Sequence, residues 1–391
     1  MKSLRPLLLV VVAYGFPSGL GASQQPPPLQ DPTKFNRPSL PGGADSSDWE
    51  AYFDHGVSLL RTNPRTAEQA FYWASRLDPS RAEPLYGRWI AYWMRVPGWF
   101  EEYVAERPRV LESPRVIAVD SLYLRALFRN PLMPRTLTVL LFDQLPGRWR
   151  TDRFTTAVLE YGANRFDAAA ADFGKLVRDE PKNYRLRYEL ALCFTAVRRY
   201  DSATAELTAL LEEMGRRDEK QLAHSYQSKE LLDYSVGLLQ LARGNRVAAR
   251  EALQQALVEN LAFYPAHSTL AELALSQGDR ATAWSEYAQA IDVGPGDGVL
   301  RYRFGAALGL AGRHEEAEPQ LRKAEELEPW FAPSYFTLAR VLEARGQRQQ
   351  ALDQYREYVL RAPRSAPELD QAQARIAALS SPQAPGDSIH H

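Results

Sequence analysis

A chain of 391 residues with a formal net charge of −1 lacks the basic excess of a nucleic-acid-binding surface, so we expect no nucleic-acid partner. Hydrophobic residues make up 45% of the chain and charged residues 24%, which are the proportions of an ordinary globular protein. The length alone suggests about two or three domains, an expectation that does not apply to repeat arrays, in which each unit contacts only its neighbours.

Residues 1–22 have the pattern of a secretory signal peptide. Lys2 and Arg5 supply the positive start, an apolar stretch follows from Leu7 to Ala13, and small residues form a cleavage region that ends at Ala22. The apolar stretch is too short to span a bilayer. We therefore expect an exported chain with no membrane span after cleavage; an uncleaved anchor is the alternative. This pattern and the excess of arginine over lysine indicate a bacterial periplasm or cell envelope.

The two ends of the chain have the composition of unstructured segments. Residues 23–47 are rich in Gln, Pro, Gly and Ser and are predicted to be a disordered linker, with folded structure beginning near Asp48 or Trp49. Residues 380–391 are predicted to be a frayed tail.

Residues 48–95 contain a degenerate helical pair followed by one further helix, which we expect from about Leu85 to Arg95. Residues 96–150 show no traceable repeat. Ser113–Pro114 is a strong helix start, because serine caps a helix and proline suits its first turn, and Met133–Pro134 is a weaker one. This segment is either an irregular helical insert or two units that have diverged too far to trace.

The clearest pattern is a 34-residue repeat in the C-terminal part. A turn glycine, a small residue of the second helix and a closing proline each recur three times at that interval: Gly278, Gly312 and Gly346; Ala283, Ala317 and Ala351; Pro295, Pro329 and Pro363. Glycine is expected where the backbone is left-handed, and proline where a helix has ended. The same spacing is traceable in two earlier units over residues 151–215 and in four units over residues 216–365.

A 34-residue step with these residue types resembles the tetratricopeptide repeat family. The resemblance implies an all-α fold, a right-handed solenoid of about seven helix–turn–helix units with the irregular insert between them. Residues 366–379 have the polar composition of a C-terminal capping helix. In this family, the fifth place of each unit points into a concave groove where extended peptides lie.

Aromatic residues recur at that fifth place, which makes them candidates for binding in the groove: Phe154, Tyr188, Tyr234, Tyr302 and Phe336. The alternative is that these rings only pack between helices, because tyrosine is common at this place in the family. The carboxylate clamp for which the family is best known, built from lysine and asparagine, is absent; the ninth place holds, among others, Leu192, Glu272 and Arg340.

A second candidate surface lies in the densest aromatic cluster, which includes Trp89, Trp93 and Trp99. Tyr86, Trp89 and Trp93 share one helical face, so packing against the insert is one interpretation. The other is an exposed aromatic platform that stacks on a sugar or a peptide.

No pattern of catalytic, cofactor or metal-binding residues is present in the sequence. The histidines share no metal-ligand spacing, and the single Cys193 is expected to be an inert core residue. We therefore expect a non-catalytic scaffold or assembly factor that binds a protein or peptide, without cofactor or metal. The alternatives are a glycan- or cell-wall-binding module and an enzyme with its site in the insert.

Overall fold

The computed structural model describes residues 35–96, 114–142, 152–181, 183, 185–218 and 228–381. All regular secondary structure in these ranges is helical, which confirms the predicted all-α solenoid class. The described residues form two compact units. Unit 2 takes residues 37–55, 73–80 and everything from residue 294 onward, and unit 1 takes the rest. We describe each unit separately.

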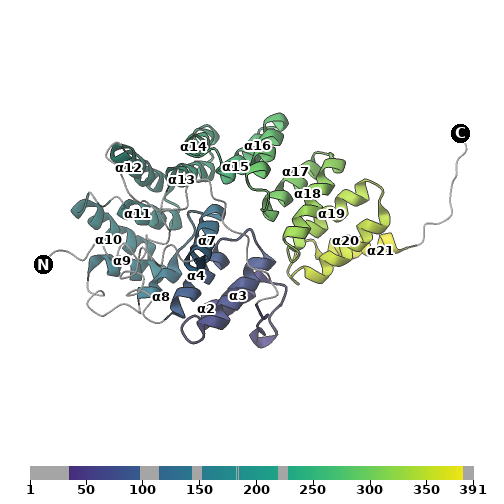
Figure 1. Cartoon of the computed structure of the whole chain (residues 1–391), viewed down its shortest axis with the longest axis horizontal. Helices are drawn as coiled ribbons and strands as arrows, with labels where there is room; N and C mark the ends of the chain where they lie inside the picture. Colours follow the sequence, from purple (N-terminus) through teal and green to yellow (C-terminus); the bar gives the residue numbers. More distant parts are fainter. Residues whose placement is uncertain are drawn as a thin grey trace, which may run out of the picture. The chain divides into compact units, whose positions relative to one another are not determined.

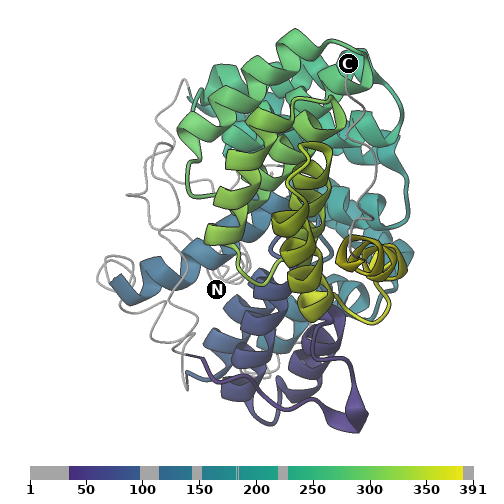
Figure 2. The same cartoon turned by 90° about the vertical axis from the view of Figure 1, so that its right-hand side faces the viewer.

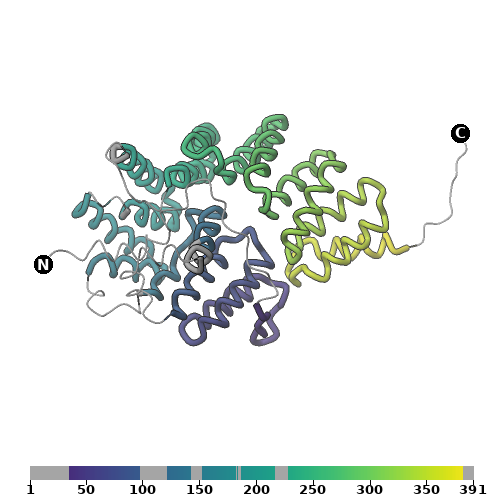
Figure 3. The backbone as a smooth tube through the Cα atoms, in the orientation of Figure 1, coloured from purple at the N-terminus to yellow at the C-terminus, as the bar shows by residue number. Residues whose placement is uncertain are grey.

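Unit 1 contains most of the helical pairs. Two helices, α2 (Trp49–Leu59) and α3 (Pro64–Leu77), contribute residues to both units. The others belong to unit 1 alone: α4 (Glu83–Met94), α7 (Pro114–Arg129), η3 (Thr136–Thr138), α8 (Val139–Phe142), α9 (Arg153–Gly162), α10 (Phe166–Asp179), α11 (Arg185–Ala196), α12 (Tyr200–Asp218), α13 (Lys229–Ala242), α14 (Arg246–Glu259), α15 (Tyr264–Ser276) and α16 (Arg280–Val293). From α9 onward, consecutive helices of this unit pack against each other, as the backbone tube in Figure 3 shows.

Unit 2 contains the last two regular pairs and a final helix. Its helices are α17 (Gly298–Leu310), α18 (His314–Leu327), α19 (Ala332–Ala344), α20 (Arg348–Arg361) and α21 (Leu369–Ser380), together with the short turn η2 (Pro41–Gly43). Each of the helices α17 to α21 packs on the next, and Figures 1 and 2 show this order in the green and yellow part of the chain. The predicted capping helix is therefore present, but it begins at Leu369 rather than at 366.

The turn glycines have the backbone conformation that the repeat predicts. Gly278, Gly312 and Gly346 have φ angles of 78°, 79° and 74°, in the left-handed region that glycine enters without steric cost. Asn164 and Arg198, which lie 34 residues apart, take the same conformation with φ angles of 60° and 58°. These two turns belong to the two units over residues 151–215. The repeat spacing was traceable there, although asparagine and arginine stand in place of the turn glycine.

Close approach of the paired helices depends on small residues at their crossing. A Cβ atom added to Gly305 of α17 would lie 2.6 Å from Cγ of Leu321 and 3.2 Å from the Ala317 carbonyl oxygen, both in α18. Ala317 itself is fully buried. The pair therefore has no room for a larger side chain at this crossing.

We expect Ala317→Leu to lower the free energy of unfolding by roughly 1–3 kcal/mol, because added methylenes in a packed interior force shifts of side chains and backbone. Urea unfolding followed by circular dichroism measures this loss. Ala374→Leu on the exposed side of α21 is the control and should stay within about 0.5 kcal/mol of the wild type. Equal stability of the two variants would contradict the assigned register of α17 and α18.

The predicted disordered linker is wrong for residues 35–47, which pack on folded parts of the chain. The Arg37 guanidinium lies 4.7 Å from the ring centroid of Trp73 and 5.6 Å from that of Trp330, and the carboxylate of Asp45 accepts a hydrogen bond from the Arg364 amide. Composition alone missed this order, because a few aromatic and charged side chains hold the segment in place. Helix α2 does begin at Trp49, where folding was expected to start.

A buried ion pair also joins the N-terminal part of unit 2 to its C-terminal repeats. The Arg76 guanidinium lies 2.8 Å from the carboxylate of Glu328, and it donates a further hydrogen bond of 3.3 Å to the Leu327 carbonyl. Both charged side chains are less than a tenth exposed. These contacts connect residues that are about 250 positions apart in the sequence, which a purely nearest-neighbour repeat array would not have.

Two other boundaries differ from the sequence-based expectation. Helix α12 continues to Asp218, beyond the expected end of its unit at residue 215. Helix α7 begins at Pro114 as predicted and packs on α4, whereas Met133–Pro134 starts no α-helix, since residues 130–135 are non-helical and lead into η3. In its described residues 114–142 the insert thus consists of one long helix, a non-helical stretch with a turn, and short helical turns.

Several predictions fall outside the described residues. These are the signal peptide, residues 23–34 of the linker, Trp99 and most of the C-terminal tail. Among the helices that the structure does describe, none combines the length and the apolar character needed to cross a membrane.

Candidate functional site

The fifth-place tyrosine of α11 does not face an open groove in unit 1, because the insert lies against it. The Tyr188 hydroxyl donates a hydrogen bond of 2.8 Å to the carbonyl oxygen of Pro131. The neighbouring Glu189 accepts two hydrogen bonds, of 3.0 and 3.1 Å, from the Arg135 guanidinium. The non-helical stretch of the insert therefore covers this side of α11.

Arg135 is the centre of this contact. Its side chain is 6% exposed, donates a 2.6 Å hydrogen bond to the Tyr123 hydroxyl and lies 4.9 Å from the ring centroid of Tyr188. Burial acts to lower the pKa of Arg135, but the Glu189 carboxylate and the nearby tyrosines outweigh it and hold that pKa well above its usual value. The guanidinium is therefore charged inside unit 1 and paired through its two terminal nitrogens, whereas its buried Nε has no hydrogen-bond partner.

Other residues of the insert extend this contact. Met133 is fully buried, and the Phe128 ring packs edge-on against Phe263 and Tyr264 at centroid distances of 5.2 and 5.7 Å. The Tyr86 hydroxyl donates to the Arg135 carbonyl oxygen at 3.2 Å. Apolar, aromatic and charged contacts together fix the insert in the groove of unit 1.

Three of the predicted groove residues are consequently buried rather than open to a partner. Phe154 is 7% exposed, Tyr188 1% and Tyr234 6%. The Phe154 ring packs on Phe173, and Tyr234 packs on Phe263. The prediction that these three residues bind a partner on an open surface is therefore wrong, because the insert and the adjoining helices cover them.

The predicted aromatic platform is also wrong for the two tryptophans that the structure describes. Trp89 and Trp93 are 6% and 5% exposed. Trp89 stacks on Tyr123 of α7 at a centroid distance of 5.0 Å and on Tyr86 at 6.2 Å. Both tryptophans are core residues of unit 1 and cannot stack on a sugar. Packing against the insert was one of the two interpretations of their helical spacing.

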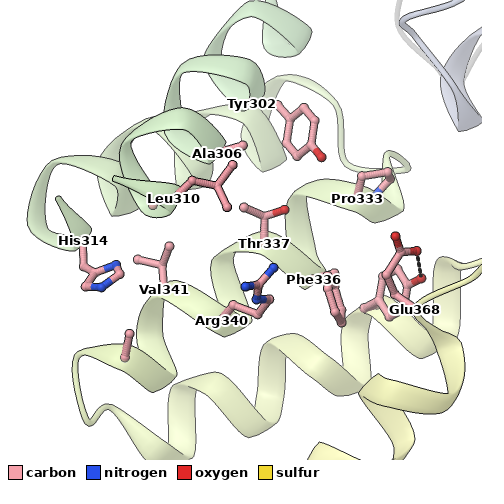
Figure 4. A pocket seen from close by; sticks show the side chains of 13 residues that line it. Tyr302, Ala306, Leu310, His314, Pro333, Phe336, Thr337, Arg340, Val341 and Glu368 are labelled. Atoms are coloured by element: carbon pink, nitrogen blue, oxygen red, sulfur yellow. Dashed lines mark hydrogen bonds between the residues drawn. The ribbon is translucent and has the colours of Figure 1, made fainter. Parts of the chain in front are cut away.

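In unit 2 the groove is open and forms a pocket of about 500 Å³. Figure 4 shows its side chains converging from α17 and α19. The lining residues come from these two helices, from the start of α18, from α20 and from the segment before α21: Tyr302, Ala306, Gly309, Leu310, His314, Pro333, Phe336, Thr337, Arg340, Val341, Ala344, Tyr358 and Glu368. Two of the predicted groove residues are among them: Tyr302, which is partly exposed, and Phe336, which is 7% exposed and thus as buried as Phe154.

The charged groups of this pocket differ in how they are paired. The Glu368 carboxylate accepts a hydrogen bond of 3.2 Å from the buried Tyr358 hydroxyl. Arg340 is exposed and, within the described part of the chain, forms no ion pair or hydrogen bond. Nδ1 of His314 is buried and has no hydrogen-bond partner there either. Figure 4 places His314 and Glu368 at opposite ends, with Arg340 between them.

The walls of the pocket are mainly apolar. Leu310 is 81% exposed, which is unusual for a leucine at the edge of a cavity. The Tyr302 side chain is half-buried. An apolar cavity with a small number of convergent polar groups is the usual form of a ligand site.

No binding role was predicted from the sequence for Arg340, His314 or Glu368. Of these three, Arg340 could have been selected by its position, because it occupies the ninth place of its unit.

The comparisons with known proteins agree with the repeat assignment. The sequence profile described as tetratricopeptide repeat matches residues 160–222 and 310–376, so the chain carries repeats of this type in both units. No curated protein matches the sequence.

Solved structures with a similar fold are distant in sequence. The crystal structure of YrrB, described as a TPR protein with an unusual peptide-binding site, is 17% identical, covers 52% of this chain and 97% of its own, and has a TM-score of 0.40. The C-terminal part of a TPR repeat-containing protein from Cytophaga hutchinsonii is 16% identical, with coverages of 58% and 95% and a TM-score of 0.44. The APC/C hetero-tetramer Cut9-Hcn1 is 14% identical, with coverages of 85% and 63% and a TM-score of 0.45.

Proposed function

We propose that this tetratricopeptide-repeat chain is a non-catalytic binding protein that holds an extended segment of a partner protein in the pocket of unit 2. The observation that carries the proposal is the exposed, unpaired Arg340 set among apolar walls between α17 and α19. Repeat solenoids use their concave surfaces for such contacts. An exposed cation beside an apolar cavity offers a partner both apolar burial and charge pairing.

The two grooves of the chain support a division of roles. In unit 1 the fifth-place Tyr188 already holds the insert, through Pro131 and the buried Arg135–Glu189 pair. In unit 2 the equivalent ring, Tyr302, lines a cavity instead. Binding of a partner is therefore assigned to unit 2, and the groove of unit 1 has a structural role.

Two potentially reactive side chains of unit 1, Cys193 and His267, have structural rather than catalytic surroundings. Cys193 is fully buried, and burial raises the pKa of its thiol far above the usual value, so the nucleophilic thiolate does not form at neutral pH. His267 lies 2.6 Å from the carboxylate of Glu286, but its other ring nitrogen is 3.3 Å from the Leu261 carbonyl oxygen. With both nitrogens engaged, this histidine is a structural link between helices.

The proposal includes a bacterial envelope location as an assembly factor or scaffold. Its support is the signal-like pattern of residues 1–22 and the arginine-rich composition. The pocket itself does not depend on this location.

Selection from a displayed library of random 12-residue peptides tests the binding role on the full chain. We expect the selected peptides to lose at least tenfold in affinity, about 1.4 kcal/mol, when Ala306→Trp fills the pocket. Ala306 lies on the wall of the pocket, whereas Ala374 is an exposed alanine on α21 outside it. Ala374→Trp is thus a matched control and should leave affinity unchanged. Peptides that bind the Ala306→Trp variant as well as the wild type would overturn the proposed site.

A further inference from the structure

We infer that the pocket of unit 2 takes an internal acidic segment: a non-helical stretch of a partner whose Asp or Glu side chain pairs with Arg340. This inference rests on the proposed function and adds the chemistry of the partner. It comes from comparing the pocket with the groove of unit 1, where the chain shows one occupant in place.

The occupant of unit 1 is a non-helical internal segment that contains a turn at Pro131–Leu132 and carries a charged side chain. Residues 130–135 are non-helical and continue at both ends, into α7 and into η3. A fifth-place tyrosine, Tyr188, binds a backbone carbonyl of this segment, and the groove carboxylate of Glu189 pairs with its cation, Arg135. The groove therefore recognises one main-chain acceptor and, four residues later, one side-chain charge.

Unit 2 offers the same kinds of group with the charge reversed. Tyr302 takes the fifth place in α17, as Tyr188 does in α11. Of the two charged side chains that line this pocket, Glu368 accepts a hydrogen bond from Tyr358, whereas the Arg340 guanidinium has no hydrogen bond or ion pair within the described residues. A guanidinium binds a carboxylate with two parallel hydrogen bonds, so the complementary side chain is Asp or Glu.

The other titratable groups of the pocket do not reverse this charge preference. Glu368 already accepts a hydrogen bond from Tyr358 and lies at the end of the pocket away from His314. The imidazole ring of His314 carries no negative charge, so it does not oppose an acidic ligand. Glu368 has no cation paired with it in the described residues either, but its hydrogen bond from Tyr358 leaves Arg340 as the charged side chain of the cavity without a partner.

Peptides copied from the chain's own insert provide the probe. The native sequence of residues 128–138 is FRNPLMPRTLT, and the test peptide carries Arg135→Glu, so that only the charge is reversed. We expect the full chain to bind the Glu peptide at least tenfold more tightly than the Arg peptide, as measured by fluorescence anisotropy at low salt. High salt should reduce the difference, because exposed charge pairs are screened.

A variant of the chain tests whether Arg340 makes this choice. Arg340→Glu should reverse the preference and bind the Arg peptide more tightly. Arg356→Glu is the matched control, because Arg356 is an exposed arginine of α20 outside the pocket, and it should keep the wild-type preference. An unchanged preference in Arg340→Glu, or no preference in the wild type, would overturn the inference.

A third peptide separates an internal acid from a chain terminus. It ends after Pro134, so its terminal carboxylate stands where the Glu side chain would begin. Tighter binding of this truncated peptide than of the Glu peptide would contradict the internal segment. If library-selected peptides depend on Ala306 but ignore the charge at Arg340, the acidic specificity fails while the proposed binding function stands.

Discussion

Replacing Arg135 by methionine, with Glu189 retained, is expected to lower the free energy of unfolding by about 3–5 kcal/mol, the usual cost of leaving one partner of a buried ion pair unpaired. The two side chains are 6% and 17% exposed, so water cannot substitute for the lost guanidinium. The Tyr123 hydroxyl also loses its hydrogen bond to Arg135. Urea unfolding of the full chain, followed by circular dichroism, measures the effect.

The double variant Arg135→Met with Glu189→Leu is the informative comparison. Replacing both charges by apolar side chains of similar size is often close to neutral. We therefore expect the double variant to recover most of the stability that the single variant loses. A double variant that is as unstable as the single one would show that Arg135 acts through packing on Tyr188 rather than through charge.

Phe71→Ala is expected to cost a similar 3–5 kcal/mol, because a large ring is removed from a site that cannot collapse around the gap. Phe71 is fully buried between two glycines of neighbouring helices. A Cβ atom added to Gly56 or to Gly87 would lie 2.8 or 2.7 Å from the Phe71 ring. The ring thus fills the space that both glycines leave open.

Val247→Ala is the control for the Phe71 variant, since Val247 is 71% exposed and should change stability by no more than about 0.5 kcal/mol. Thermal melting of the two variants gives the comparison. Gly87→Ala should destabilise the wild type but cost less in the Phe71→Ala background, because the added methyl group enters the emptied space. Additive losses would argue against direct contact between these residues.

The parts of the fold that follow from local rules could be predicted from the sequence. Gly312 lies in a left-handed turn because few other residues take that conformation without strain, so its spacing revealed the repeat. Helix α7 begins at Pro114, where the capping signal predicted it. Residues 35–47 were predicted incorrectly, because their order depends on rings such as Trp330 that are distant in the sequence.

The candidate site was predictable only in part, because the exposure of its residues also depends on contacts that are distant in the sequence. The fifth-place rule selected Tyr302 and Phe336, which line the pocket of unit 2 although Phe336 is itself buried, and it equally selected Tyr188, which is buried under the insert. Which of these rings stays accessible depends on where the insert lies, and the insert has no repeat from which to place it. Arg340 becomes notable only once the described structure shows that no carboxylate pairs with it.

Unit 2 is built from segments that are far apart in the sequence, so its parts are synthesised at different times. Residues 37–55 and 73–80 leave the ribosome early, but the rest of their unit starts more than 200 residues later. At a typical rate of translation this separation lasts roughly 10–40 s. During that time Trp73 and Arg76 have neither Trp330 nor Glu328 to pack against. A chain truncated before α17 therefore lacks the native partners of its own N-terminal segment as well as its last repeats.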